Sequence, residues 1–196
     1  MGTRASTVLT VLVLFVSGGA LPHTAPAPAW RASSLDTALR DSEELKRLHD
    51  EDQADRASET LDWSVVGPRD RARLNRVKEL FAADGLHTAM DYYRAAMVLQ
   101  HGEAAEDFLL AHEFCIVAII KGKNDRESAW LAASAEDRFL MTVERPQRFG
   151  TQFRSESNGP LRLYKVGPGV TDELRRLMGV HPLAEAKAHE AELNKK

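Results

Sequence analysis

The chain has 196 residues, of which 43% are hydrophobic and 28% are charged, and its formal net charge is −3. This length suits one domain with a substantial core and is short for two domains. Acidic and basic residues are interleaved, without a basic stripe that also carries aromatic residues, so we expect neither nucleic acid nor an anionic membrane surface as a partner.

The beginning of the chain has the pattern of a secretory signal. Arg4 is followed by an uninterrupted apolar run over residues 8–16 and then by small residues around Ala20. Residues 1–29 are therefore expected to form a signal peptide and a proline- and alanine-rich linker. The run is shorter than the roughly 20 apolar residues of a membrane span. We expect a secreted or periplasmic protein with no stable membrane span after cleavage, and the alternative is an uncleaved amino-terminal anchor.

Residues 33–193 are expected to form a single, mainly α-helical domain. Apolar residues recur at helical spacing through most of this region, which predicts about six to seven helices, with one β-hairpin near residues 147–166. The first helix is expected to begin after Ser33 or Ser34, either of which can cap it.

The second half of this first helix carries polar residues on one face. His49, Asp52, Gln53 and Arg56 recur at helical spacing. One interpretation is a solvated face with an ion pair between Asp52 and Arg56, and the other is a surface that binds a ligand.

The boundaries of the next helices are predicted from capping and stop signals. Pro68 suits the first turn of the second helix, which Gly85 follows, and Thr88 can cap the third. The fourth helix ends at Gly122 and is apolar on every side, so we expect it to be the central helix. Asp125 can cap the fifth helix, and two short helices are expected near the end of the chain.

The expected hairpin follows the fifth helix. Phe149 and Phe153 fall on one face of an alternating segment, and Asn158-Gly159 is a strong turn signal. One hairpin alone is marginally stable, so it should lie on the helices as a clasp over their polar faces. Because strand residues alternate between faces, Gln147 and Gln152 are expected to point in opposite directions unless a bulge intervenes.

Signatures of metal sites and nucleophiles are weak. The sequence contains no HExxH, no CxxC and no glycine-rich phosphate loop, so we expect no metal and no cofactor. Cys115 lies among apolar residues and is expected to be a buried, unreactive thiol. A nucleophilic role would need a neighbour such as His112 to lower the pKa of that thiol.

Five motifs follow one another along the chain: DQADR (52–56), QHG (100–102), AEDR (135–138), QRFGTQ (147–152) and DELRRLMGVHPL (172–183). Their order resembles a bacterial family of unknown function, over about residues 35–190. The usual tyrosine of the fourth motif is Phe149 here. The resemblance implies no activity, but it implies that these positions belong together: Asp52, Gln53, Arg56, His101, Asp137, Arg138, Gln147, Gly150, Thr151 and Gln152.

Two classes of function follow from this polar set. The first is an exported domain that binds an unknown ligand or protein partner under the hairpin, with these binding residues: Asp52, Gln53, Arg56, Arg138, Gln147, Thr151 and Gln152. The second is a hydrolase-like or transferase-like enzyme in which His101 and Asp137 are an acid/base pair. The second class requires His101 and Asp137 to lie within hydrogen-bonding reach in an open pocket.

Overall fold

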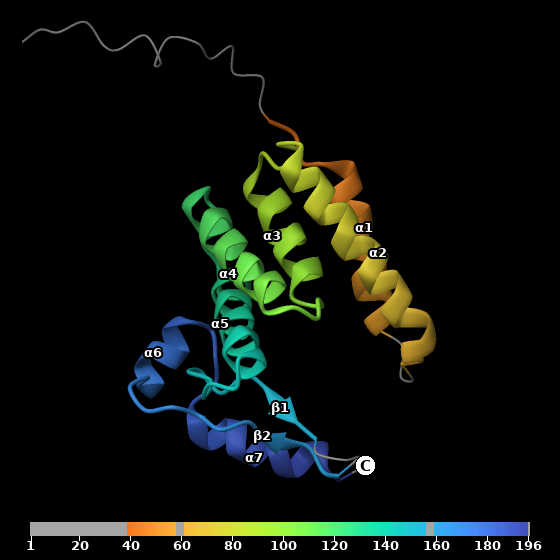
Figure 1. Ribbon diagram of the computed structural model, residues 1–196. Helices are drawn as coiled ribbons and strands as arrows, with labels where there is room; N and C mark the ends of the chain where they lie inside the picture. Colours follow the sequence, from red (N-terminus) through yellow and green to blue (C-terminus); the bar gives the residue numbers. More distant parts are fainter. Residues whose placement is uncertain (1–38, 58–60, 156–158, 196) are drawn as a thin grey trace, which may run out of the picture. The chain divides into compact units, whose positions relative to one another are not determined.

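The computed structural model describes residues 39–57, 61–155 and 159–195 (Figure 1). These residues form seven helices and one antiparallel pair of strands, so the fold is mainly α with a hairpin, as predicted. The elements are α1 (Glu43–Arg56), α2 (Trp63–Ala82), α3 (Ala89–Leu99), α4 (Ala105–Ile120), α5 (Arg126–Thr142), β1 (Phe153–Arg154), β2 (Arg162–Leu163), α6 (Asp172–Leu177) and α7 (Leu183–Leu193). The expected signal peptide and linker lie outside the described residues.

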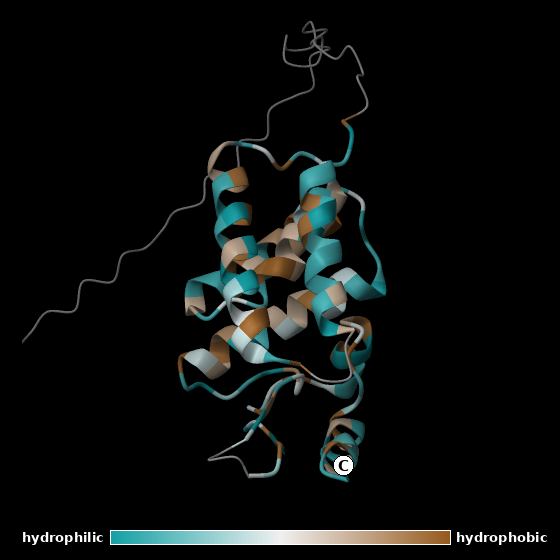
Figure 2. Cartoon of the chain, turned by 90° about the vertical axis from the view of Figure 1, so that its right-hand side faces the viewer, coloured by the Kyte–Doolittle hydropathy of each residue, from teal (hydrophilic) through white to brown (hydrophobic). Residues whose placement is uncertain are grey.

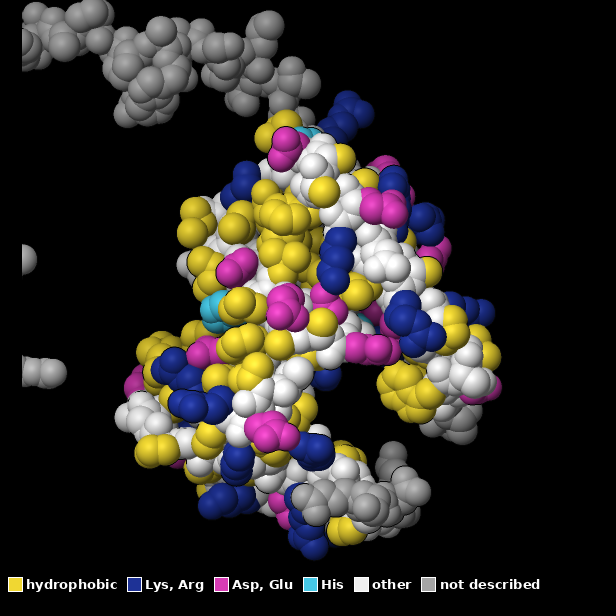
Figure 3. Space-filling model, in the orientation of Figure 1, with side chains coloured by type: hydrophobic (Ala, Val, Ile, Leu, Met, Phe, Trp, Pro, Cys, Tyr) yellow, Lys and Arg dark blue, Asp and Glu magenta, His cyan; other side chains and the backbone are white. Residues whose placement is uncertain are grey.

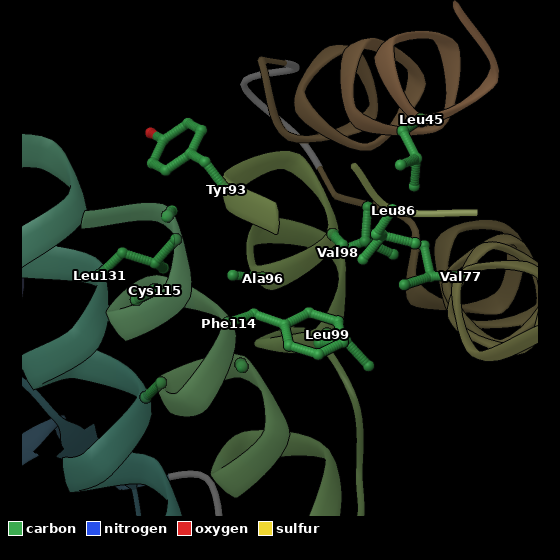
Figure 4. Close-up of a cluster of buried hydrophobic side chains, with 14 of the residues drawn as sticks. Leu45, Val77, Leu86, Tyr93, Ala96, Val98, Leu99, Phe114, Cys115 and Leu131 are labelled. Atoms are coloured by element: carbon green, nitrogen blue, oxygen red, sulfur yellow. The ribbon is translucent and has the colours of Figure 1, made fainter. Parts of the chain in front are cut away.

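Helices α1 to α5 enclose the main hydrophobic core (Figure 4). Small residues let the helices approach closely: Ala96 of α3, Ala118 of α4 and Ala132 of α5 are fully buried. Leu99 and Leu131 fill the space between them. Hydrophobic residues gather inside the helical body, and α1 and α2 present mostly hydrophilic outer faces (Figure 2). Among the described helices, none is long and apolar enough to cross a membrane.

Helix α4 packs against both α3 and α5, but it is not buried on every side as its sequence predicted. Leu109 and Ile116 are each 40% exposed, and Ile120 is 78% exposed. Helical periodicity places these three residues on one outer face, so overall hydrophobicity overestimated the burial of this helix.

Two predicted helix starts are wrong. The predicted caps Ser33 and Ser34 lie outside the described residues, and a helix does not run on from them, because residues 39–42 are not helical and α1 begins at Glu43, where Ser42 accepts a hydrogen bond from the Leu45 amide. Helix α2 begins at Trp63, capped by Asp62, so Pro68 lies in its second turn rather than its first. Pro68 has no amide hydrogen, so one carbonyl near the start of the helix lacks its usual partner. The free-energy cost there is smaller than in a helix interior.

Two predicted caps are confirmed. Thr88 accepts a hydrogen bond from the Asp91 amide, and Asp91 accepts one from the Thr88 amide, which completes a capping box for α3. Asp125 caps α5 by accepting from the Ser128 amide. These short-range signals decide where α3 and α5 begin.

The hairpin is shorter than predicted and its first arm is not a continuous strand. Phe153 pairs with Leu163 and Arg154 with Arg162 in the antiparallel ladder, and one isolated bridge joins Gln147 to Val166. The preceding residues 148–151 form a loop, with Gly150 at a φ of 88°. Glycine adopts this left-handed conformation without steric cost. The loop is held against α5, as described below.

Candidate functional site

The polar residues singled out in the sequence divide into two separate groups. One group surrounds the loop 148–151 and satisfies hydrogen bonds within the protein. The other group joins α1, α2, the α3–α4 connection and α5 around an open cavity. Asp137 belongs to the first group and its neighbour Arg138 to the second.

Asp137 is fully buried and binds the backbone of the loop. Its carboxylate accepts hydrogen bonds from the amides of Arg148, Phe149, Gly150 and Thr151, at 2.7–3.2 Å, and from the Thr151 hydroxyl at 2.9 Å. Successive amides that converge on one carboxylate form an anion-binding concavity. Asp137 therefore fixes the loop on α5, and both of its carboxylate oxygens are occupied by hydrogen bonds from the loop.

Arg175 of α6 holds the same loop through its carbonyls. Its Nε donates to the Phe149 carbonyl at 2.9 Å, and a second guanidinium nitrogen donates to the Arg148 carbonyl at 3.2 Å. Its side chain is only 4% exposed. The Asp137 carboxylate therefore binds the amides of this loop, and the Arg175 guanidinium binds its carbonyls.

Gln147 and Gln152 lie together, which corrects the expectation that they point apart. The Gln147 side chain donates to the Gln152 carbonyl at 3.0 Å and accepts from the Gln152 amide at 2.9 Å. The turn at Gly150 removes the strand alternation on which that expectation depended. Gln152 reaches the Ser134 hydroxyl at 3.0 Å. Both glutamines are buried, so they hold the hairpin in place instead of facing a ligand.

The second group is built around Asp52 of α1, which is fully buried. Its carboxylate accepts from Arg56 at 2.9 Å and from Gln53 at 2.8 Å, and it lies 3.0 Å from Nδ1 of His101. His101 follows the end of α3 and comes from 49 residues further along the chain. Gln53 is itself exposed.

Two further residues of this group, Asp70 and Arg73, were not predicted from the sequence. Arg56 makes a two-point contact with the Asp70 carboxylate at 2.8 and 3.2 Å, and Arg73 reaches the same carboxylate at 2.6 Å. Burial raises the pKa of Asp70, but the hydrogen bonds from Arg56 and Arg73 outweigh this effect and lower it. Both residues lie on α2 at a spacing of three, and this pair of opposite charges falls inside the helix predicted after Pro68, where the spacing was the available signal.

An open cavity of about 510 Å³ borders the hairpin and α7, and a larger one of about 710 Å³ borders the second group. The larger cavity is lined by Arg56, Asp70, His101 and Arg138, and by the apolar side chains of Leu61, Trp63, Leu74 and Ala104. Figure 3 shows the surface hollowed beside the end of α1 and the beginning of α2, where charged and hydrophobic side chains meet. Trp63 is 62% exposed, so an aromatic surface is available at the rim.

Among the described residues that line this cavity, Arg138 is the charge without a partner. Its guanidinium forms no ion pair or hydrogen bond with any described residue, and its Nε is buried. Burial lowers the pKa of Arg138, and the positive charge of Arg56 lowers it further. An arginine remains protonated despite such a shift. The nearby ion pairs match three carboxylates (Asp52, Asp55 and Asp70) with three guanidiniums (Arg56, Arg69 and Arg73), so Arg138 is a fourth guanidinium left over.

His101 lies in the same cavity and is not paired with Asp137, which corrects the expected acid/base pair. Its Nδ1 is bonded to Asp52, while both oxygens of Asp137 bind the loop. Burial lowers the pKa of His101, and the charges of Arg56 and Arg138 add to this effect, although Asp52 raises the pKa. The ring is therefore neutral at pH 7.

Other candidate chemistry is not supported. Burial raises the pKa of Cys115 to about 12, so its thiol stays protonated. Nδ1 of His112 donates a hydrogen bond to the Ala132 carbonyl, 2.9 Å away. Within the described part of the chain, no group of three or more metal-ligating side chains converges.

Comparisons with protein-family models, with curated proteins and with solved structures find no match for this chain. The resemblance to a bacterial family therefore stays a prediction. Any functional conclusion has to come from the geometry of the larger cavity.

Proposed function

We propose that the protein binds a small molecule with one negative charge in the cavity at Arg138. The observation that carries this proposal is the guanidinium of Arg138, partly buried beside an open cavity without a carboxylate partner in the described chain. A charge held away from water is costly unless it is paired. A bound anion would supply the missing partner.

The charge balance and the walls of the cavity indicate the class of ligand. One guanidinium in excess matches one negative charge, and a carboxylate accepts two parallel hydrogen bonds from a guanidinium. Leu61 and Trp63 offer apolar surface next to it. These features favour a carboxylate attached to an apolar or aromatic body over inorganic phosphate, which is more highly charged and lacks such a body.

The test is a calorimetric titration of the protein with sodium butyrate, sodium benzoate and inorganic phosphate. We expect butyrate or benzoate to bind, and Arg138→Ala to weaken that binding at least tenfold, which corresponds to about 1.4 kcal/mol. Arg71→Ala is the matched control, because Arg71 lines the same cavity but is already paired with Glu103. Failure of both carboxylates to bind, or equal binding by Arg138→Ala, would disprove the proposal.

We also propose that the protein acts outside the cytoplasm. Support comes from the signal-like pattern of Arg4, the apolar run 8–16 and the small residues that follow. Expression of the full chain in a bacterial host, followed by mass spectrometry of the product, tests this. Cleavage between residues 20 and 29 and recovery outside the cytoplasm are expected, and an intact amino terminus in the cytoplasm would contradict the proposal.

A further inference from the structure

We propose that His101 and Asp52 activate a water molecule in this cavity, and that the protein hydrolyses neutral esters of small apolar carboxylic acids. This inference rests on the carboxylate binding proposed above, since the carboxylate would be the product of the reaction. It assigns an activity to the site, with His101 as the catalytic base and Asp52 as its positioning residue.

The geometry of the pair suits this role. Asp52 lies 3.0 Å from Nδ1 of His101 and is 1% exposed at its side chain, whereas the His101 side chain is 14% exposed and lines the cavity. A carboxylate at Nδ1 favours the tautomer with the proton on Nδ1, which leaves the lone pair on Nε2. Among the described residues, none hydrogen-bonds Nε2. The same pairing stabilises the imidazolium that forms when Nε2 takes a proton.

Asp52 is itself fixed in place by other residues. Arg56 and Gln53 hold its two oxygens from one turn and one residue away. Arg56 is held in turn by Asp70 of α2. The carboxylate that orients His101 is therefore anchored on both α1 and α2, as a positioning group needs to be.

The composition of the cavity wall indicates that water is the nucleophile. The described side chains that line it include no serine, threonine, cysteine or lysine. We therefore assign water as the nucleophile that His101 deprotonates. The cavity is open to solvent, which supplies the water.

The single excess charge decides between esters of carboxylic acids and phosphodiesters. Attack on a neutral ester turns its carbonyl oxygen into an oxyanion with one negative charge, and Arg138 can match it. A phosphodiester already has one negative charge and gains a second during attack, which one excess guanidinium does not match. Because Arg138 faces a neutral carbonyl before the reaction and an oxyanion during it, it binds the transition state more strongly than the substrate.

The reaction balances with water as the only co-reactant. His101 Nε2 takes a proton from water, whose oxygen forms a bond to the carbonyl carbon and produces the oxyanion. The intermediate collapses, the bond from carbon to the ester oxygen breaks, and the leaving alkoxide takes the proton back from His101. The acid then ionises in solvent, and its carboxylate is the monoanion expected to bind Arg138.

The test is hydrolysis of p-nitrophenyl butyrate by the full chain, measured over a range of substrate concentrations and pH. We expect saturable release of p-nitrophenol with wild-type protein, and a fall in kcat of about 100-fold or more in His101→Gln. His181→Ala is the matched control and should leave the rate unchanged, because His181 is exposed and pairs with Glu185 away from this cavity. Equal rates for wild type and His101→Gln would overturn the inference.

The pH profile separates a base in this cavity from a histidine on the surface. The rate should rise with pH as His101 loses its proton, with a midpoint below the ordinary histidine value of 6.5. Asp52→Asn should displace this midpoint as well as lower the rate, which a merely structural residue would not do. A profile with its midpoint at 6.5 that survives in Asp52→Asn would contradict the assignment.

Failure of the binding proposal and failure of the esterase proposal give different experimental results. Calorimetry with butyrate on the same preparations shows whether the cavity binds the product. Butyrate binding that Arg138→Ala abolishes, without hydrolysis of the ester, would overturn the esterase activity and leave the binding function in place. Absence of binding by both butyrate and benzoate would overturn the binding function directly.

Discussion

At the scale of single residues, the buried carboxylates are satisfied in two different ways. Asp137 is surrounded by backbone amides, whose positions are fixed by the loop that they belong to. Asp52 is surrounded by side chains from α1 and by His101. The first arrangement is complete without a ligand, and the second is part of an open cavity. This difference explains why neighbouring polar motifs have separate roles.

Replacing Asp137 with alanine should destabilise the protein strongly. The change would leave four loop amides without an acceptor, three of them from residues that are buried or partly buried, and each unpaired group costs about 1–3 kcal/mol. We expect a loss of at least 3 kcal/mol in the free energy of unfolding, measured by urea denaturation. Glu136→Ala is the control, because Glu136 makes only a surface ion pair with Arg148 and should cost less than about 1 kcal/mol. Similar losses in both variants would show that the loop does not depend on Asp137.

At the scale of elements, α2 contains two residues that disfavour a helix. Gly67 and Pro68 lie in its second turn, directly after the buried Val66. The helix forms because Val66, Leu74 and Val77 are buried along it, while Asp70 and Arg73 join the polar group. Tertiary contacts outweigh local preference here, as they commonly do in helices of proteins.

Gly67→Ala should stabilise α2. An added Cβ would meet nothing closer than Arg71 at 3.7 Å, an ordinary contact, and alanine favours a helix over glycine by about 0.5–1 kcal/mol. Gly102→Ala is the contrasting change, since its Cβ would lie 2.5 Å from the Asp107 carboxylate that begins α4. We expect thermal unfolding to occur at a higher temperature in Gly67→Ala and at a lower one in Gly102→Ala. A decrease for Gly67→Ala would contradict the contribution assigned to helix preference.

At the scale of the whole molecule, short-range signals predicted more than long-range ones. The caps at Thr88 and Asp125 depend on residues three positions apart, and the structure confirms both. The pairing of His101 with Asp52 joins residues 49 positions apart, and nothing local to either distinguishes Asp52 from Asp137 as its partner. The sequence therefore indicated the mainly α fold and most of the polar residues, while their division into two groups depended on how the helices pack.

The stability of the molecule should depend on pH in the range where His101 titrates. Its pKa in the folded protein is lowered from 6.5, mainly by burial, so the unfolded chain binds more protons in the interval between the two values. The stabilisation that neutral His101 provides is therefore complete above pH 6.5, and it is lost as the pH falls toward the lowered pKa of the folded protein. The pKa values of Asp70 and Asp91 are lowered below 3.8, so their contributions are lost only in more acidic solution.

Urea denaturation at pH 7.5 and pH 5.5 measures the difference in the free energy of unfolding between the two pH values, which should be smaller in His101→Gln than in wild type. Bound butyrate should also reduce it, because an anion near the imidazole favours its protonated form, and an unchanged difference in both cases would show that His101 does not titrate in this interval.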